Sequence, residues 1–271
     1  MTARLLSGVV MAGGIIAVLL YTPWWVMGLV VLAALFVGAD EYMGMARPDA
    51  PTYDKAVFVF ANLLVLAWPV VEPHFPVYQH GPALMTGFLA LAVGRLARPL
   101  PIETALSRLG ADAVGLFYIG VTFPYIFQLR NFEYGGWVLV MVMSITFMSD
   151  TGGYFAGRFL GKHKLYPTVS PKKTVEGALG GIAAATGAAF LARAVFPGHD
   201  RLDVIDCVVL GVGGAVFAII GDLVESLMKR AYGVKDSGTL IPGHGGALDR
   251  IDGLLFAGPF CWFYLRATGL W

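Results

Sequence analysis

The chain has 271 residues, of which 57% are hydrophobic and 14% are Asp, Glu, Lys or Arg, whereas soluble proteins carry about 25% charged residues. Together with a mean hydropathy of +0.71, this composition excludes a disordered chain, a small disulfide-linked domain and a basic nucleic-acid-binding domain. An integral membrane protein remains. Cys207 and Cys261 lie in apolar runs without a CxxC spacing, so we expect both to be small buried hydrophobic side chains.

Nine mostly apolar segments are long enough to cross the ~30 Å hydrocarbon layer as helices, which takes about 17 to 25 residues. They cover residues 4–21, 23–39, 56–71, 82–97, 109–129, 136–158, 177–196, 204–227 and 251–268. The third and fourth are short and only a Thr-Pro turn separates the first two, so eight spans with one re-entrant segment are the alternative. The predicted fold is an all-α integral membrane protein with about nine transmembrane helices.

The distribution of Lys and Arg supports nine spans and predicts their orientation. Short cytoplasmic loops hold an excess of these residues. With the N-terminus in the cytoplasm, the inside segments hold 15 of the 19. We therefore predict an inner-membrane protein with a cytoplasmic N-terminus and a C-terminus outside. The two most basic loops, after the sixth and eighth spans, then face the compartment that contains nucleotides.

The two halves of the chain differ in character. In the first half, the polar loops 40–55 and 72–81 look like ordinary connections. From about Phe147 onward, glycines and charges enter the apolar runs themselves. We predict an N-terminal transmembrane helical bundle over residues 1–135 and a C-terminal transmembrane catalytic region over residues 136–271.

The first unusual stretch is S-D-T-G-G-Y-F-A-G-R-F-L-G, residues 149–161. Asp150 falls at the end of the sixth span, and a carboxylate in a membrane is costly enough that a functional role is the default hypothesis. The alternative is a helix-end carboxylate that is hydrogen-bonded to Ser149 or Thr151. Close helix packing best explains the glycines that recur every four residues, which are Gly153, Gly157 and Gly161.

The second stretch is S-P-K-K-T-V-E-G, residues 170–177. Ser170 before Pro171 predicts the N-cap and first position of the seventh helix, which would direct backbone N–H groups and the positive dipole end outward beside Lys172 and Lys173. This arrangement favours an anion site. The alternative is an ordinary positively charged flank that contacts lipid headgroups.

The third stretch covers residues 221–252 and contains several carboxylates. On a helix, Asp222, Glu225 and Lys229 share one face, and Asp249 and Asp252 share another. Carboxylates at membrane depth repel each other unless bases or a hard cation compensate them, and Mg²⁺ favours such oxygen ligands. The Gly-His-Gly-Gly turn at 243–246 lets a phosphate approach backbone N–H groups. No other His is close in sequence, which disfavours a zinc site.

At this third stretch the sequence resembles the phosphatidate cytidylyltransferase family, the CDP-diacylglycerol synthases. The run from 226 to 252, S-x-x-K-R-x4-K-D-S-G-x3-P-G-H-G-G-x2-D-R-x-D, is similar to the family signature over more than a dozen positions. The S-D-T-x-x-Y-x-x-G-R and S-P-K-K-T-x-E-G blocks also resemble family blocks, apart from Gly153, where Ala is more usual. The N-terminal half resembles the family only in span number and polarity.

The resemblance implies transfer of the cytidylyl group of CTP to phosphatidate in phospholipid biosynthesis, giving CDP-diacylglycerol and pyrophosphate, with Mg²⁺ required. It also implies a homodimer and a polar cavity open to the cytoplasm and to membrane lipids, with K⁺ as a candidate second ion. The metal-binding aspartates of the family map onto Asp222 and Asp249, with Asp252 close by.

The chemistry expected of such a site is positioning and charge neutralisation, because phosphatidate has its second pKa near 6 and is already largely ionised at neutral pH. We assign catalysis to Asp222, Asp249, Asp150 and Lys172. The expected substrate-binding residues are Ser149, Lys173, Glu176, Glu225, Ser226, Lys229, Arg230, Lys235, Asp236, Gly243, His244, Gly245, Gly246 and Arg250.

Two other functions compete with this interpretation. A CTP-dependent polyprenol or phytol kinase would transfer the γ-phosphoryl group to a lipid alcohol, which must lose a proton to a general base. An ion-coupled transporter would use Asp150 and Asp222 as cation ligands at the bilayer midplane. The transporter leaves the Gly-His-Gly-Gly turn and the one-sided basic loops unexplained.

Overall fold

The computed structural model describes residues 13–240 and 245–270, and these are mostly helical. After a helical stretch at 13–21, the chain forms α2 (Trp24–Ala46), α3 (Thr52–Leu66), α4 (Trp68–Val71), α5 (His80–Ala97), α6 (Ala105–Gly115), α7 (Phe123–Arg130), α8 (Gly135–Leu160), α9 (Val175–Val195), α10 (Val204–Ala231) and α11 (Leu248–Ala267). A π-helical turn, η2 (Leu116–Val121), joins α6 to α7, and two 3₁₀ turns are η1 (Ile102–Thr104) and η3 (His199–Arg201).

The helices follow the predicted spans closely, and the protein is a multi-pass membrane protein. Among the described residues, five helices are long and apolar enough to cross a membrane: Trp24–Ala46, Ile102–Arg130, Gly135–Leu160, Val175–Val195 and Val204–Ala231. The first half of the first predicted span, 4–12, lies outside the described residues, and its second half, 13–21, is helical. Nine crossings and the orientation of the termini stay predictions.

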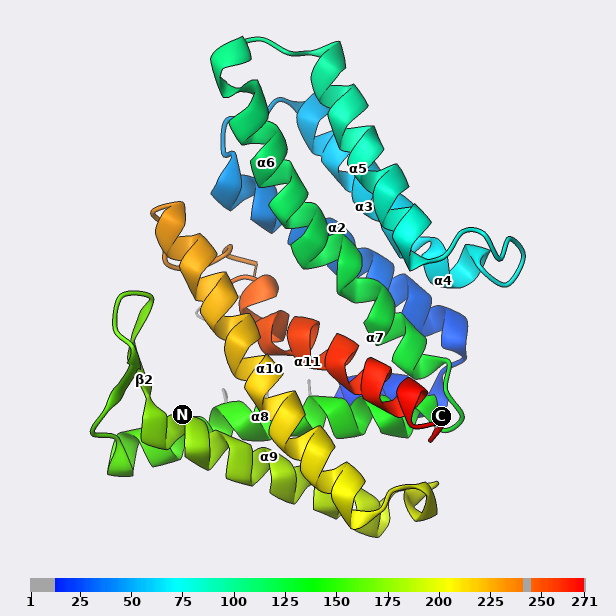
Figure 1. Ribbon diagram of the computed structural model, residues 1–271, viewed down its shortest axis with the longest axis vertical. Coiled ribbons are helices and arrows are strands. Elements are labelled where there is room, and N and C mark those ends of the chain that lie inside the picture. Colours follow the sequence, from blue (N-terminus) through cyan, green and yellow to red (C-terminus); the bar gives the residue numbers. More distant parts are fainter. Residues whose placement is uncertain (1–12, 241–244, 271) are drawn as a thin grey trace.

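Helices α8 and α9 pack side by side at one end of the molecule, and α10 crosses them (Figure 1). Small residues permit the close approach. A Cβ atom built on Gly153 would lie 3.4 Å from the carbonyl oxygen of Gly177, and one on Gly157 would lie 3.6 Å from the Gly177 Cα. The packing role predicted for Gly153 and Gly157 is confirmed, whereas Gly161 follows the end of α8, where a Cβ atom would lie 2.9 Å from the Thr174 side chain.

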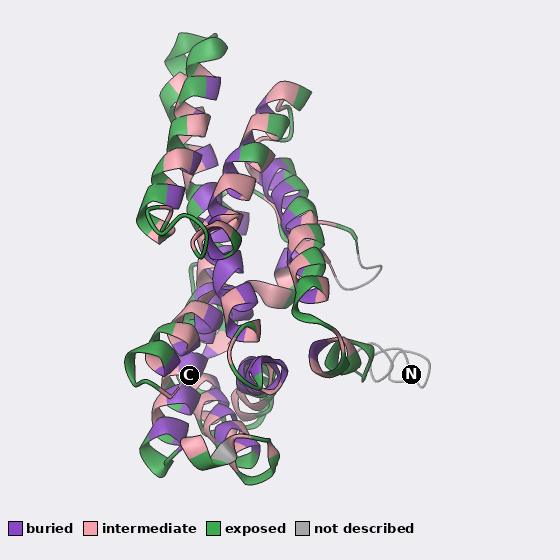
Figure 2. Ribbon diagram, turned by 90° about the vertical axis from the view of Figure 1, so that its right-hand side faces the viewer, coloured by how far each residue is buried: buried purple, intermediate pink, exposed green. Residues whose placement is uncertain are grey.

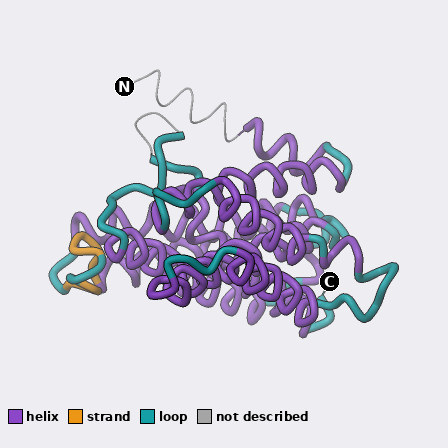
Figure 3. Tube along the Cα trace, turned by 90° about the horizontal axis from the view of Figure 1, so that it is seen from above, coloured by secondary structure: helices purple, strands orange, loops and turns teal. Residues whose placement is uncertain are grey.

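A two-stranded antiparallel hairpin stands between α8 and α9, formed by β1 (Lys164–Tyr166) and β2 (Ser170–Thr174). It lies at one end of the helical body (Figure 3). The prediction that Ser170 caps the seventh helix is therefore wrong. Pairing with β1 keeps residues 170–174 extended, and the helix begins at Val175, where the Thr174 hydroxyl accepts a hydrogen bond from Gly177 N–H at 3.1 Å. An all-α description omits this hairpin.

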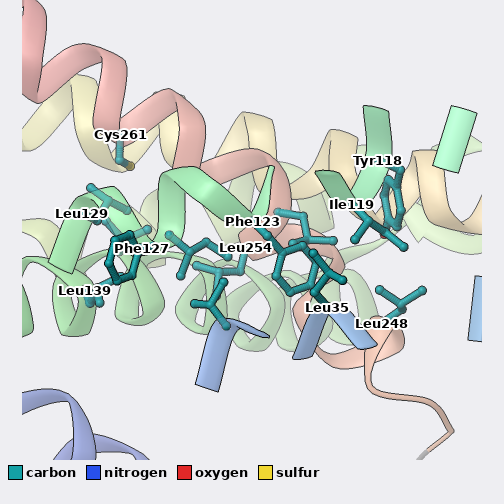
Figure 4. Close-up of a cluster of buried hydrophobic side chains, with 14 of the residues drawn as sticks. Leu35, Tyr118, Ile119, Phe123, Phe127, Leu129, Leu139, Leu248, Leu254 and Cys261 are labelled. Atoms are coloured by element: carbon teal, nitrogen blue, oxygen red, sulfur yellow. The ribbon is translucent and has the colours of Figure 1, made fainter. Parts of the chain in front are cut away.

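Buried side chains form one main core that spans both halves of the chain. Burial is greatest where the helices cross and falls toward their ends (Figure 2). Leu35 of α2, Phe123 of α7 and Leu248 of α11 are all buried in this cluster (Figure 4). Cys207 and Cys261 are free and buried, as predicted. The boundary proposed near residue 135 stays a prediction, and the core passes across it.

The loop 40–55 is not an ordinary connection, contrary to expectation. Arg47 pairs with Asp54 and, through Nη1, with Asp112 Oδ2 at 2.8 Å. Arg95 Nη2 lies 3.0 Å from Asp54 Oδ2 and 3.1 Å from Asp112 Oδ2. All four side chains are at most 10% exposed. This buried ion-pair cluster joins the end of α2 to α3, α5 and α6.

Candidate active site

The three sequence blocks meet at a cavity of about 380 Å³ bounded by α8, the hairpin, α9 and α10. Its lining residues from the first and second blocks include Ser149, Asp150, Lys172 and Lys173, and α10 contributes Asp222. Ser149 is buried, and its hydroxyl has no hydrogen-bond partner in the described part of the chain. The hydroxyl oxygen lies at the contact with α9, where a Cβ atom built on Gly181 would be 3.2 Å from it.

Lys173 and Asp222 join opposite walls of the cavity. Lys173 Nζ lies 2.7 Å from Asp222 Oδ2, and both side chains are partly exposed to the cavity. The charges of Lys173 and Arg250 also act on Asp150. No hydrogen bond between Asp150 and Ser149 or Thr151 is present among the described residues. The structure therefore does not support the alternative in which Asp150 is only a hydrogen-bonded carboxylate at the end of the helix. The cavity thus combines cations and carboxylates, the groups that bind phosphates and their counter-ions.

Next to the cavity along α10, the polar face of this helix meets the beginning of α11. Ser226 Oγ donates to Asp222 Oδ1 at 3.2 Å, one turn along the helix. Lys229 Nζ lies 2.5 Å from Asp249 Oδ1 and 3.4 Å from Glu225 Oε1. The predicted shared face of α10 is therefore present, and Lys229 links it to α11.

Asp249 is the most strongly hydrogen-bonded carboxylate of this region. Lys229 contacts Oδ1, and the other oxygen, Oδ2, accepts from Ser237 N–H at 2.9 Å, from Ser237 Oγ at 2.9 Å and from Gly246 N–H at 2.8 Å. Burial by itself raises the pKa of Asp249, but the Lys229 and backbone hydrogen bonds outweigh it and hold the pKa below its ordinary value. Asp249 is consequently ionised throughout the physiological pH range.

Glu225 has the opposite environment. It is fully buried, neither of its carboxyl oxygens has a hydrogen-bond donor among the described residues, and the carboxyl group of Asp252 lies next to it. The hydroxyl of Tyr118, on the π-helical turn η2, is also buried without a partner and faces these charges. Lys229 Nζ, 3.4 Å from Glu225 Oε1, supplies one positive charge to these two neighbouring carboxyl groups. A second positive charge, or a proton held between the two groups, would balance the pair, because burial of uncompensated negative charge is costly.

The remaining predicted site residues lie in several places. Glu176 does not line the cavity and instead accepts hydrogen bonds from Lys162 N–H at 3.0 Å and His163 N–H at 3.2 Å, which hold the start of the hairpin. Arg230 Nη1 donates to the Val234 carbonyl at 3.0 Å. Lys235, Asp236 and Arg250 are exposed. Gly243 and His244 lie outside the described residues.

The two described glycines of the turn have specific roles. Gly245 has a φ of +82°, in the left-handed region that glycine tolerates best. Gly246 is buried and donates its N–H to Asp249. In the structure, the Gly246 N–H of this turn therefore binds the carboxylate of Asp249, whereas the sequence suggested that N–H groups of the turn bind a phosphate.

Sequence reasoning missed Glu41, Ser237 and Tyr118. Ser237 lies within the K-D-S-G motif but was not assigned a contact, and the hydrogen bonds to Asp249 show that it belongs to the site. Glu41 follows the second predicted span, and its partners Ser237, Ala247 and Leu248 are about two hundred residues away. No local pattern signals such a contact.

Comparison with known proteins agrees with the motif blocks. A model of the cytidylyltransferase family matches residues 2–268, nearly the whole chain. A phosphatidate cytidylyltransferase of Haemophilus influenzae is 32% identical, with 96% of this chain and 97% of the relative covered.

Two further relatives carry the same name. A phosphatidate cytidylyltransferase of Brucella suis is 36% identical over 76% of this chain and 74% of its own length. One from Bacillus subtilis is 42% identical, and that match spans 58% of each chain. The resemblance inferred from the motifs is confirmed, and the chain belongs to the cytidylyltransferase family.

Proposed function

We propose that the protein is a phosphatidate cytidylyltransferase that transfers the cytidylyl group of CTP to phosphatidate. The observation that carries the proposal is the cavity in which Lys172 and Lys173 of the hairpin face Asp150 and Asp222. The family match and the named relatives favour this reaction over the lipid-alcohol kinase and the transporter.

The reaction joins two polyanions, so the principal barrier is electrostatic repulsion. A phosphatidate oxygen attacks the α-phosphorus of CTP, a new P–O bond forms, the α–β bond breaks, and pyrophosphate leaves with the electron pair. Because the phosphate monoester has its second pKa near 6, the nucleophile is already ionised and needs no general base. Lys172 and Lys173 would neutralise phosphate charge, and Ser149 would form part of the cavity wall beside them.

Mg²⁺ is part of this proposal, with K⁺ as a candidate second ion. Asp222, Asp249 and Asp252 would hold the metal, and the buried Glu225 beside Asp252, with Lys229 3.4 Å from its Oε1, adds further negative charge to this region. Among the described residues no group of three such side chains is arranged around one point, since Lys173 and Lys229 hold Asp222 and Asp249. When bound, the ion would supply positive charge to phosphate oxygens.

The location and assembly of the protein complete the proposal. An inner-membrane protein whose site faces the cytoplasm would have direct access to CTP and to membrane lipids, and the position of 15 of 19 Lys and Arg residues on one side supports this orientation. The homodimer rests on the family resemblance.

The test uses purified protein in detergent with phosphatidate, Mg²⁺ and CTP labelled on either the α- or the γ-phosphorus. We expect the α-label to enter the lipid fraction and the γ-label to leave as pyrophosphate. A kinase would place the γ-label in the lipid, and diacylglycerol and polyprenol serve as alternative acceptors. An absence of α-labelled lipid would contradict the proposed function.

A further inference from the structure

Glu41 is a buried carboxylate of α2 that contacts the distant beginning of α11. It is 8% exposed. Oε1 accepts from Ala247 N–H at 2.7 Å, Oε2 accepts from Leu248 N–H at 2.9 Å, and the Ser237 hydroxyl donates to Oε2 at 3.2 Å. All three of these hydrogen bonds therefore come from two segments of the C-terminal half.

These bonds supply a cap that α11 lacks in its own sequence. The N-cap residue is Ala247, which has no side-chain acceptor, and no side-chain cap bond is present at this end. The first N–H groups of a helix need acceptors, and the helix dipole attracts negative charge to them. Glu41 meets both needs from another helix, and Asp249 is the second residue of the helix that it caps.

Ser237 connects Glu41 to Asp249. Its hydroxyl lies 3.2 Å from Glu41 Oε2 and 2.9 Å from Asp249 Oδ2, and its backbone N–H also donates to Asp249. A hydroxyl has one proton, so the two carboxylates compete for it. Displacement of Glu41 would therefore change both the position of the α11 N-terminus and the donors available to Asp249.

The packing around Glu41 fits it closely. A Cβ atom on Gly238 would lie 2.8 Å from Glu41 Oε1, and one on Gly246 would lie 2.6 Å from Glu41 Oε2. Both separations are shorter than real Cβ contacts. One turn earlier on α2, a Cβ on Gly38 would lie 3.0 Å from Leu248 Cδ2. Gly238 of the K-D-S-G motif and Gly246 of the Gly-His-Gly-Gly turn thus leave space for this carboxylate.

We propose that Glu41 is a positioning residue of the active site, which fixes the N-terminus of α11 and Ser237 and thereby sets the location of Asp249. This inference rests on the proposed cytidylyl transfer. It assigns part of the catalytic geometry to the N-terminal half of the chain.

The test compares Glu41→Gln with Asp40→Asn. The amide keeps the size of the side chain but places an N–H₂ group against backbone donors, whereas Asp40 on the same helix is exposed and pairs with Lys55 at 3.6 Å. We expect E41Q to lower kcat about tenfold to hundredfold, because small displacements of catalytic groups have effects of this size. Binding of CTP, measured as a thermal shift, should persist, and D40N should match the wild type. A folded E41Q with wild-type kcat would overturn the proposal.

A second variant approaches the same hydrogen bond from α11. Ala247 has a φ of −69°, which proline adopts, so Ala247→Pro removes the N–H that Glu41 accepts while the backbone can keep this φ. The proline ring also takes the place of the amide hydrogen and displaces the Glu41 carboxylate, which lies 2.7 Å from this nitrogen. We expect A247P to lower kcat, and the E41Q/A247P double variant to lose little more than the worse single variant. If both single variants fold, full additivity of their effects on kcat would overturn the proposal. If E41Q does not fold, wild-type kcat in A247P would still overturn it. Inactive wild-type protein would instead contradict the cytidylyl transfer itself.

Discussion

At the scale of single residues, the two lysine–carboxylate pairs divide the site into two parts. Lys173 and Asp222 lie at the cavity, and Lys229 and Asp249 lie where α10 meets α11. The first pair is partly exposed, with 24% and 29% of the side chains accessible, whereas the second is 11% and 7% exposed. A polyanionic substrate can reach the first pair directly, and the second is held by the protein.

Asp249→Asn should abolish most of the activity without preventing folding. The amide presents an N–H₂ group to Lys229 and Gly246, both of which are donors, so the charge that compensates cations at the site is lost. We expect kcat/KM to fall about 100-fold or more, measured as α-labelled lipid formed per folded protein. Asp200→Asn, an exposed carboxylate in η3, serves as the control. Activity within threefold of wild type in D249N would contradict a catalytic role.

At the scale of elements, close contacts between helix backbones position the cavity walls. Gly177 of α9 faces α8, where a Cβ atom would lie 2.9 Å from the Gly153 carbonyl oxygen. Gly187, further along α9, has open space around the position of a Cβ. The same helix therefore carries a packed and an unpacked glycine, which form a matched pair.

Gly177→Ala should destabilise the protein, and Gly187→Ala should not. The added methyl in the first variant forces α8 and α9 apart, at a cost of about 1–3 kcal/mol. In the second, it replaces a flexible residue by a better helix former. Thermal unfolding in detergent measures the difference, and a G177A midpoint equal to that of G187A would show that the helix contact is not tight.

The ion-pair cluster of α2, α3, α5 and α6 should also contribute to the free energy of unfolding. Asp54→Asn leaves Arg47 and Arg95 without one of their two partners in a buried site, which typically costs about 3–5 kcal/mol. Lys55→Gln removes only an exposed pair, worth at most about 1 kcal/mol. A lower unfolding midpoint for D54N than for K55Q is expected.

The same cluster predicts a dependence on pH. Burial by itself raises the pKa of Asp54, but Arg47 and then Arg95 outweigh it and hold the pKa below its ordinary value. Its contribution to stability is therefore present above the unfolded pKa of about 3.9 and disappears as pH falls through the lower folded pKa. The difference in midpoint between wild type and D54N should shrink in strong acid, and a constant difference would contradict this assignment.

At the scale of the whole molecule, local patterns predicted the helices and the charged blocks but not the contacts between distant segments. Asp222, Lys229 and Asp249 belong to a single motif, so their proximity follows from helix spacing and a short connection. Ser170 and Pro171 matched a helix start locally, and only pairing with β1 shows otherwise. The contacts of Glu41 depend on how α2 packs against α11, which no short window of sequence contains.

The predicted orientation can be tested with single cysteines. Both natural cysteines are buried, so a membrane-impermeant thiol reagent should give little background. We expect Lys164→Cys in the hairpin to react only from the cytoplasmic side and Thr268→Cys, after α11, only from the outside. Labelling of both positions from the same side would contradict the odd number of crossings predicted between the hairpin and the end of α11.

The contact between Glu41 and the start of α11 also bears on how the protein is made. A ribosome releases the acceptor early, in the second helix, and its donors only after a further 206 and 207 residues. Until the final helix has entered the bilayer, Asp249 has no fixed place against α10. A chain that is terminated before Ala247 would therefore insert many of its helices yet lack the contact that places Asp249, and we expect it to have no activity.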